Sequence, residues 1–245
     1  MKRARGQAAV ETALTLPLLL FMVLGTIQLF LLLQGRILAQ YAAGRATRMG
    51  AMNFAKCDPM MRSAIAILLP AIDASFARGG ISGAQYAVEV KKRSTTNRYS
   101  PVDDAGRDGP VVWVDRVRPI AGTINKVTEE DTWNLAPPDG PDRTLEVRMT
   151  FWFPLKIPFA NWIFARLALA HWGVEEYRAV SPYLAATRDA KWTMDPTAVA
   201  PPAAISSELQ SRYHSSPPQY VFPIQATSAM RMMSPARFVG QACPR

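Results

Sequence analysis

The chain has 245 residues, 49% of them hydrophobic, and its 28 lysines and arginines against 19 acidic residues give a net charge of +9. This length suits one medium domain or a small domain with appendages, and the apolar fraction is ordinary for a globular protein. The positive charge is scattered and does not alternate with aromatic residues, so it does not indicate a nucleic-acid partner.

Residues 12–33 are the most apolar segment and contain no charged residue. At about 1.5 Å per residue, a helix of this length is roughly 33 Å long, enough to cross a hydrocarbon core of about 30 Å. Lys2, Arg3 and Arg5 precede the segment, but the apolar run is longer than a secretory-signal core of about 7–15 residues. We therefore expect a retained membrane span; a cleaved signal and a buried helix of a soluble protein are the alternatives. The basic cluster favours an N-terminus inside the cell.

The helix is expected to continue past the span, because residues 35–52 contain no proline. Small residues recur there at spacings of four, three and four, on one helical face: Ala39, Ala43, Ala46 and Gly50. Small side chains allow a neighbouring element to approach closely. The stripe predicts packing either by this chain's own domain or by a neighbouring subunit.

A second helix is expected to begin with Asp58 as the capping carboxylate and Pro59 in the first turn, and to end at Gly79 and Gly80. Pro70 should kink this helix. Its apolar residues recur at helical spacing: Met61, Ile65, Leu68, Ile72 and Phe76.

Four later segments predict strands. Residues 86–90 alternate apolar and polar positions, with the basic run at 91–93 as a solvated hairpin loop after them. Residues 111–117 are a shorter candidate, and residues 144–153 alternate most clearly. Residues 224–232 alternate again, and we expect them to join the same sheet.

Two further segments complete the chain. Residues 159–172 are apolar but too short to span a bilayer, so we expect a core helix or a surface-seated helix. Prolines accumulate after Tyr183, and residues 193–219 are expected to be irregular and mobile. The fold class is therefore α+β: a long N-terminal transmembrane helix, then a helix and a small antiparallel β-sheet head domain.

No arrangement of residues predicts catalysis, a metal site or a cofactor. The two histidines, His171 and His214, lie far in sequence from either cysteine. Residues 103–109 resemble the start of a calcium loop, but Gly106 removes a ligand, so we interpret them as a simple loop. If the head lies outside the cytoplasm, a disulfide is the natural use of Cys57 and Cys243, with two unpaired buried thiols as the alternative.

The most informative stretch is RGQAAVETALTLP, residues 5–17, with a single carboxylate at the mouth of the apolar run. A short basic leader, Gly6, then QAAVE and a long apolar helix resemble a prepilin-type signal. More narrowly, AAVETALTLPLLLFMVLGTIQL, with Pro17, is similar to the TadE-like minor pilins of the tight-adherence (Tad) type IVb pilus system. Residues 145–159 and IQATSAMRM also resemble strands of that family.

The resemblance implies roles for three residues. A prepilin peptidase would cut between Gly6 and Gln7, which makes Glu11 the fifth residue of the mature chain. In the resembling pilins this glutamate meets the N-terminal amine of the next subunit and serves in assembly. The other interpretation is that Glu11 lies in the headgroup layer, where the helix dipole favours negative charge.

The expected organisation follows from the resemblance and the patterns together. Residues 1–6 would be the leader, 7–52 the N-terminal helix with its span at about 12–33, and 57–192 an extracytoplasmic α+β head. Residues 193–219 would be a flexible Pro-rich segment, and 220–245 the C-terminal strand and tail. The protein would be a single-pass protein of a bacterial inner membrane with a periplasmic or extracellular head, able to enter a pilus.

Three function classes stay open at this point. The first is a minor pilin or pseudopilin, a structural subunit of a Tad pilus or related secretion apparatus. Its partners would be the prepilin peptidase, other pilins or pseudopilins, the inner-membrane Tad assembly machinery and membrane lipid. The second is an uncleaved single-span protein whose extracytoplasmic domain binds a partner, and the third is a membrane-tethered enzyme.

Overall fold

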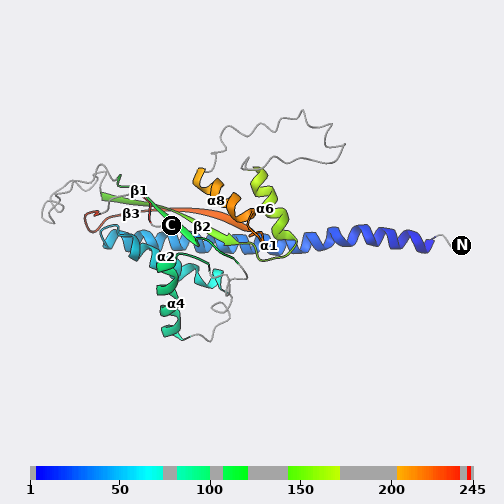
Figure 1. The fold of residues 1–245 in the computed structure, drawn as a ribbon, viewed down its shortest axis with the longest axis horizontal. Helices are drawn as coiled ribbons and strands as arrows, with labels where there is room; N and C mark the ends of the chain where they lie inside the picture. The colour runs from blue at the N-terminus through cyan, green and yellow to red at the C-terminus, as the bar shows by residue number, and fades with distance from the viewer. Residues whose placement is uncertain are drawn as a thin grey trace, which may run out of the picture. The chain divides into compact units, whose positions relative to one another are not determined.

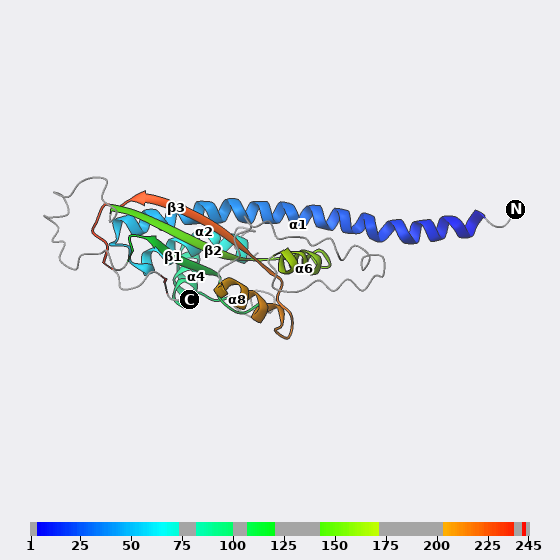
Figure 2. The same ribbon diagram turned by 90° about the horizontal axis from the view of Figure 1, so that it is seen from above.

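The computed structural model describes residues 4–73, 82–99, 107–120, 143–171, 203–237 and 242–243. A long N-terminal helix is followed by further helices and a small antiparallel sheet, which confirms the predicted α+β class (Figures 1 and 2). The elements in chain order are α1 (Ala4–Met52), α2 (Cys57–Ile72), α4 (Gly83–Thr96), β1 (Val112–Arg118), β2 (Thr144–Pro154), α6 (Ala160–His171), α8 (Ala203–Tyr213) and β3 (Val221–Arg231). The chain divides into two compact units: Met1–Gln28 with Lys156–Val221, and Leu29–Leu155 with Phe222–Arg245.

Helix α1 is 49 residues long and includes Pro17. Proline removes one backbone hydrogen bond, a loss that membrane helices tolerate. The helix ends at Met52, as predicted, and the chain turns at Phe54 and Ala55, whose φ angles are 57° and 55°. The Ala55 amide donates to the Gly50 carbonyl at 2.8 Å and closes the last turn.

The sheet has the strand order β1-β2-β3, so the three later predicted strands share one sheet as expected. Strands β1 and β2 pair antiparallel, with Val112 opposite Phe151 and Val114 opposite Met149. The predicted inward residues of β2 are all buried: Leu145, Val147, Met149, Phe151 and Phe153. Trp152 is buried on the other face, where its ring meets Trp113 edge to face at 4.9 Å between centroids.

The second half of α1 packs against this sheet and against α2. We call the sheet, α2 and α4 together the head. In this half of α1, the small residues Ala39, Ala42, Ala43 and Ala46 have no exposed surface. A Cβ added to Gly50 would lie 2.6 Å from Met60 Sδ and 2.7 Å from a methyl carbon of Leu145, so these side chains would have to shift to admit it. The small-residue stripe is therefore covered by this chain's own head.

Hydrogen bonds join the same half of α1 to β3. The Gln40 side-chain amide donates to the Thr227 carbonyl at 3.0 Å, and the Thr47 hydroxyl lies 3.4 Å from the Ser228 carbonyl. Just past β3, the Met233 amide donates to the Ala51 carbonyl at 3.0 Å. The helix and the strand are thus held by polar contacts along the packed apolar face.

The strand predicted at residues 86–90 is wrong, because this segment forms helix α4. Ser82 and Gln85 make a capping box, in which the Ser82 hydroxyl accepts from the Gln85 amide and the Gln85 side chain accepts from the Ser82 amide. The Tyr86 hydroxyl donates to the Ala66 carbonyl of α2, and burial raises the pKa of Tyr86. These contacts fix the start of α4 and pack it on α2.

The solvated hairpin loop predicted at residues 91–93 is also wrong. These residues lie in the last turns of α4, where Arg93 is buried and its Nε lies 2.7 Å from Glu89 Oε1. An ion pair at this spacing joins successive turns of a helix.

Two further boundaries differ from the sequence expectation. Helix α2 begins at Cys57 with Lys56 as its N-cap, so Asp58 is not the cap but lies in the first turn, where the helix dipole favours it. The helix ends at Ile72; Phe76, Gly79 and Gly80 lie outside the described residues.

Helix α8 occupies part of the segment that was expected to be irregular. Ile205, Leu209 and Arg212 are buried at helical spacing, and Arg212 Nε lies 2.7 Å from Glu208 Oε1. The Pro-rich composition masked this short helical pattern. Residues 193–202, and residues 103–106 of the calcium-like stretch, lie outside the described residues.

Candidate functional site

The predicted functional residues fall into two groups. Gly6 and Gln7 lie near the start of α1, and Glu11 follows one turn later with an exposed side chain. Cys57 and Cys243 belong to the other compact unit. The structure therefore places the three residues with predicted cleavage and assembly roles on one helix.

Large apolar side chains cover the first half of α1. Leu14, Leu18 and Met22 are 73%, 70% and 70% exposed. Others in the same stretch are also exposed: Leu16, Leu19, Leu20, Val23, Ile27, Leu29, Phe30 and Leu33. A soluble protein does not leave so large a continuous apolar surface in water, so this surface requires lipid or other apolar helices around it.

The polar groups within the apolar run find partners close by. The Thr15 hydroxyl donates to the Glu11 carbonyl at 3.0 Å, and the Thr26 hydroxyl to the Val23 carbonyl at 2.8 Å. A hydroxyl that bonds back to its own helix costs little in an apolar medium. The threonines therefore do not oppose insertion of this helix into a membrane.

Gln28 is a functional candidate that the sequence analysis missed. Its side chain is fully buried, and its Oε1 accepts a hydrogen bond from the Ile157 amide at 3.0 Å, ahead of α6. The sequence did offer a signal, which is a lone amide side chain within an apolar run. A polar side chain in a membrane helix usually has a hydrogen-bond partner.

The cysteines lie within bonding distance in the structure. Their Cα atoms are 5.5 Å apart, within the ordinary range for a disulfide, and they are separated by 186 positions in the chain. Cys57 is the first residue of α2, and the Cys243 amide donates to the Val114 carbonyl of β1. The pair would thus tie the chain end to the sheet and to the start of α2.

Side chains from β1 and from the segment after β3 hold the turn between α1 and α2. Arg116 Nη1 donates to the Ala55 carbonyl at 2.8 Å, and the Phe54 amide donates to Ser234 Oγ at 2.9 Å. Burial lowers the pKa of Arg116. The guanidinium of Arg237 lies over the Phe54 ring, 4.7 Å from its centroid. These contacts fix the end of the long helix.

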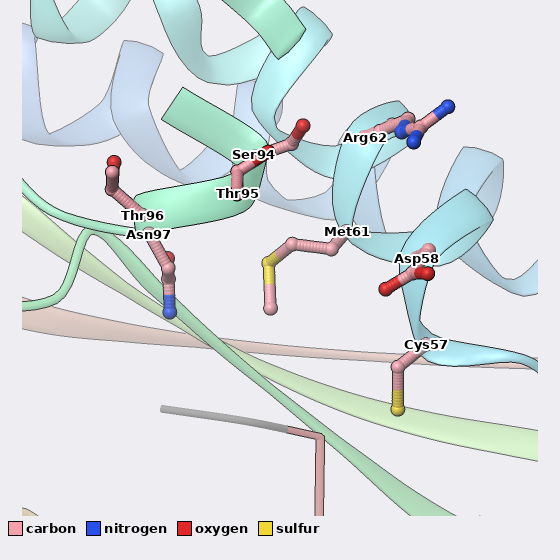
Figure 3. A pocket seen from close by; sticks show the side chains of 8 residues that line it. All are labelled: Cys57, Asp58, Met61, Arg62, Ser94, Thr95, Thr96 and Asn97. Carbon is pink, nitrogen blue, oxygen red and sulfur yellow. The ribbon is translucent and has the colours of Figure 1, made fainter. Parts of the chain in front are cut away.

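A hollow of about 330 Å³ lies between the start of α2 and the end of α4, beside Cys57 (Figure 3). Its lining is mostly polar: Cys57, Asp58, Met61, Arg62, Ser94, Thr95, Thr96 and Asn97. The three hydroxyls donate to helix carbonyls of Lys91 and Lys92. Among the described residues, no group of three or more histidine, cysteine or acidic side chains is placed to hold a metal ion.

Comparison with known families bears on most of α1. A family model described as TadE-like protein matches residues 6–48. The N-terminal segment is TadE-like. The TadE-like match begins at Gly6 and ends inside α1, so it covers the exposed apolar surface and most of the small-residue stripe. No curated protein and no solved structure matches the chain.

The exposed apolar helix indicates a membrane anchor, and the TadE-like match over residues 6–48 suggests a link to the Tad pilus. Within the described ranges, α1 is the one helix long and apolar enough to cross a membrane. TadE-like pilins are structural rather than enzymatic proteins.

Proposed function

We propose that this protein is a minor pilin, or pseudopilin, that serves as a structural subunit in assembly of a Tad pilus or a related secretion apparatus, and that it is not an enzyme. The observation that carries the proposal is the first half of α1. There a TadE-like segment starts at Gly6, places Glu11 five residues later, and continues as a helix with exposed apolar side chains. A helix of this kind can lie in lipid before assembly and against other pilin helices afterwards.

Processing is the first step of the proposed function. A prepilin peptidase cuts between Gly6 and Gln7 and removes Lys2, Arg3 and Arg5 with the leader. The cut creates a positive amine at Gln7. A glycine before the bond lets a protease approach the backbone closely.

Glu11 is the proposed assembly residue. A carboxylate within a bilayer is costly, so an acidic residue there normally has a partner. Removal of the leader lets the shortened helix move deeper, where the Glu11 carboxylate would pair with the Gln7 amine of the next subunit. Such a pair is strong only in a medium of low dielectric, so it favours assembly over the free membrane pool.

The head completes the proposal. Residues from about Cys57 onward lie in the periplasm or outside the cell, where Cys57 and Cys243 form a disulfide. Support comes from the position of the two sulfurs at bonding distance. The other partners would be the inner-membrane Tad machinery, other pilins or pseudopilins, and lipid.

N-terminal mass mapping of protein extracted from the membrane tests the processing step. We expect a mature chain that starts at Gln7, and a Gly6→Leu variant that keeps Met1. Wild-type protein that retains Met1 throughout would instead support the uncleaved single-span protein with a partner-binding domain.

The assembly step has its own test with matched variants. Glu11→Ala and Glu11→Gln should be inserted and cut normally but should not copurify with the pilus apparatus. Glu11→Asp keeps the charge and should retain part of the incorporation. A Glu11→Ala protein that assembles as well as wild type would show that the carboxylate is only an interfacial cap.

A further inference from the structure

The segment before α6 lies against the membrane helix. The Phe159 and Phe21 rings meet edge to face, 6.3 Å apart between centroids, and the Ile157 amide donates to Gln28 Oε1. A Cβ on Gly25 would lie 4.0 Å from the Phe164 ring, an ordinary contact distance. All these residues belong to one compact unit.

The positions of these contacts along α1 indicate whether a membrane or water surrounds them. At about 1.5 Å per residue, Phe21 lies roughly 14 Å from the start of the apolar run at Thr12, and Gln28 roughly 8 Å from its end at Leu33. Residues 157–159 thus contact α1 within the length of the apolar run. Any membrane around α1 must also reach this turn.

Three large apolar side chains in and just before α6 are exposed: Phe159, Trp162 and Leu167 are 56%, 48% and 58% exposed. Phe159 precedes the helix with a φ of 69°, and Trp162 and Leu167 flank the exposed Arg166 on a broad side of α6. Other residues of α6 are buried: Ala160, Ala165, Ala168 and Leu169. Figure 1 shows α6 leaving α1 steeply rather than running along it, as a helix in the plane of a membrane would leave a span.

The backbone here is suited to an apolar medium, where every amide needs an acceptor. The Ile157 amide donates to Gln28, and Pro158 has no amide hydrogen. In the first turn of α6, the Ala160 amide donates to the Pro158 carbonyl, and the Asn161 amide donates to the Ile157 carbonyl. The Trp162 amide donates to the Asn161 side chain. The amides of residues 157 and 160–162 thus have acceptors within the protein.

The charged group on this face has an aromatic neighbour. The Arg166 guanidinium lies over the Tyr213 ring of α8, 4.9 Å from its centroid. Arginine that stacks on an aromatic ring suits the boundary between headgroups and hydrocarbon, as does an indole such as Trp162. With 12 residues, α6 is too short to cross the bilayer.

We propose that α6 is a second membrane-contacting element, with Phe159, Trp162 and Leu167 in contact with bilayer lipid. The apolar surface of α6 continues that of the α1 span through the Phe21–Phe159 contact. The proposal requires only that α1 spans a membrane, and it holds whether or not the protein enters a pilus. Two contacts with the bilayer would fix how deep α1 lies and how it is rotated about its axis.

Lipid contact can be measured in the full-length protein reconstituted in phosphatidylethanolamine–phosphatidylglycerol liposomes. A fluorescent amino acid replaces Phe159, Trp162 or Leu167 in separate variants, with Met22 as the lipid-exposed reference and Gln225, exposed on β3, as the water-exposed reference. Quenching by lipids that carry a nitroxide on the acyl chain should approach that at Met22 and exceed that at Gln225 by about fivefold or more.

Two outcomes would overturn the proposal. The α6 positions could be quenched by aqueous iodide as strongly as Gln225, which would place the face in water. They could also be shielded from both quenchers, which would show that protein covers the face.

A charge variant gives a second measurement. The double substitution Trp162→Glu with Leu167→Glu should reduce lipid quenching at Phe159 to the level of Gln225, while quenching at Met22 stays unchanged. Val88→Glu, at an exposed apolar residue of α4, is the matched control and should leave quenching at Phe159 as in wild type. An unchanged signal at Phe159 in the double variant would also contradict the proposal.

Discussion

Residues 14–33 and residues 35–51 of α1 belong to one helix but differ in what their side chains contact. In the first stretch, large aliphatic side chains such as Leu18 and Met22 are exposed. In the second, small residues such as Ala43 and Ala46 are fully buried under the head. Lipid fills any shape around large side chains, whereas a folded domain needs small ones to approach the helix backbone. Side-chain size along α1 thus separates the part that needs a membrane from the part that needs a head.

The largest expected effect comes from placing charge in the first stretch. Leu18→Arg with Leu20→Arg should weaken membrane insertion by about 6 kcal/mol in total, because each arginine at the centre of a span costs about 3 kcal/mol. The head should still fold. Carbonate extraction measures the membrane-bound fraction, and near-ultraviolet circular dichroism reports the head.

Tyr41→Arg is the control for these arginines. Tyr41 is also exposed on α1 but lies past the apolar run, so its substitution should leave the membrane fraction unchanged. Equal loss from both positions would contradict the division of α1 into two stretches.

The next largest effect should follow removal of the proposed disulfide. Cys57→Ser with Cys243→Ser should lower the free energy of unfolding of the head by about 2–5 kcal/mol, because the open chain gains conformational freedom. The second stretch of α1 should then lose protection from amide hydrogen exchange, while the first stretch stays protected in lipid. Wild-type protein in which mass mapping finds both thiols free would exclude the bridge itself.

A moderate effect is expected from a single methyl group. The Cβ of Gly35→Ala would lie 2.6 Å from the buried Phe153 ring, so the substitution should destabilise the head by about 1–3 kcal/mol. Gly44→Ala is the control on the same helix, because a Cβ there meets nothing within 4 Å. It should be neutral, or stabilising by up to about 1 kcal/mol through helix propensity. Chemical denaturation in detergent compares the two, and equal midpoints would show that the helix is not seated on Phe153.

The smallest effect concerns the polar contact between α1 and β3. Gln40→Ala removes the hydrogen bond to the Thr227 carbonyl and should cost about 0.5–1.5 kcal/mol of head stability. Gln34→Ala, at another exposed glutamine of α1, should cost less than that. The same denaturation assay compares the losses of stability in the two variants. A larger loss for Gln34→Ala than for Gln40→Ala would refute the assigned contact.

Sequence alone predicted the helices and strands whose hydrophobic pattern fits only one type of secondary structure. The charge-free run and the alternation of residues 144–153 gave the correct helix and strand, because burial on one face imposes a fixed period. Residues 86–90 satisfied a strand period by chance over a short window. The stronger signal was the capping box at Ser82 and Gln85, which sets a helix start independently of periodicity.

Contacts between distant residues were beyond the sequence. The small-residue stripe showed that something approaches α1, but its identity depends on where Leu145 and Phe153 fold, which no local pattern encodes. Gln28 could be recognised as unusual within the apolar run, yet its partner Ile157 is 129 positions away. The roles of Gly6, Gln7 and Glu11 rest on the TadE-like match and stay predictions.

The proposed bridge between Cys57 and Cys243 would have a mechanical consequence for a subunit under tension. With the bridge closed, a force that pulls on the two ends of the chain passes through the disulfide. It therefore cannot stretch residues 58–242. Stretching then extends only residues 1–57 and 243–245, about 200 Å at roughly 3.5 Å per residue, against about 850 Å for the open chain. A head closed in this way would transmit a load applied through α1 instead of unravelling under it.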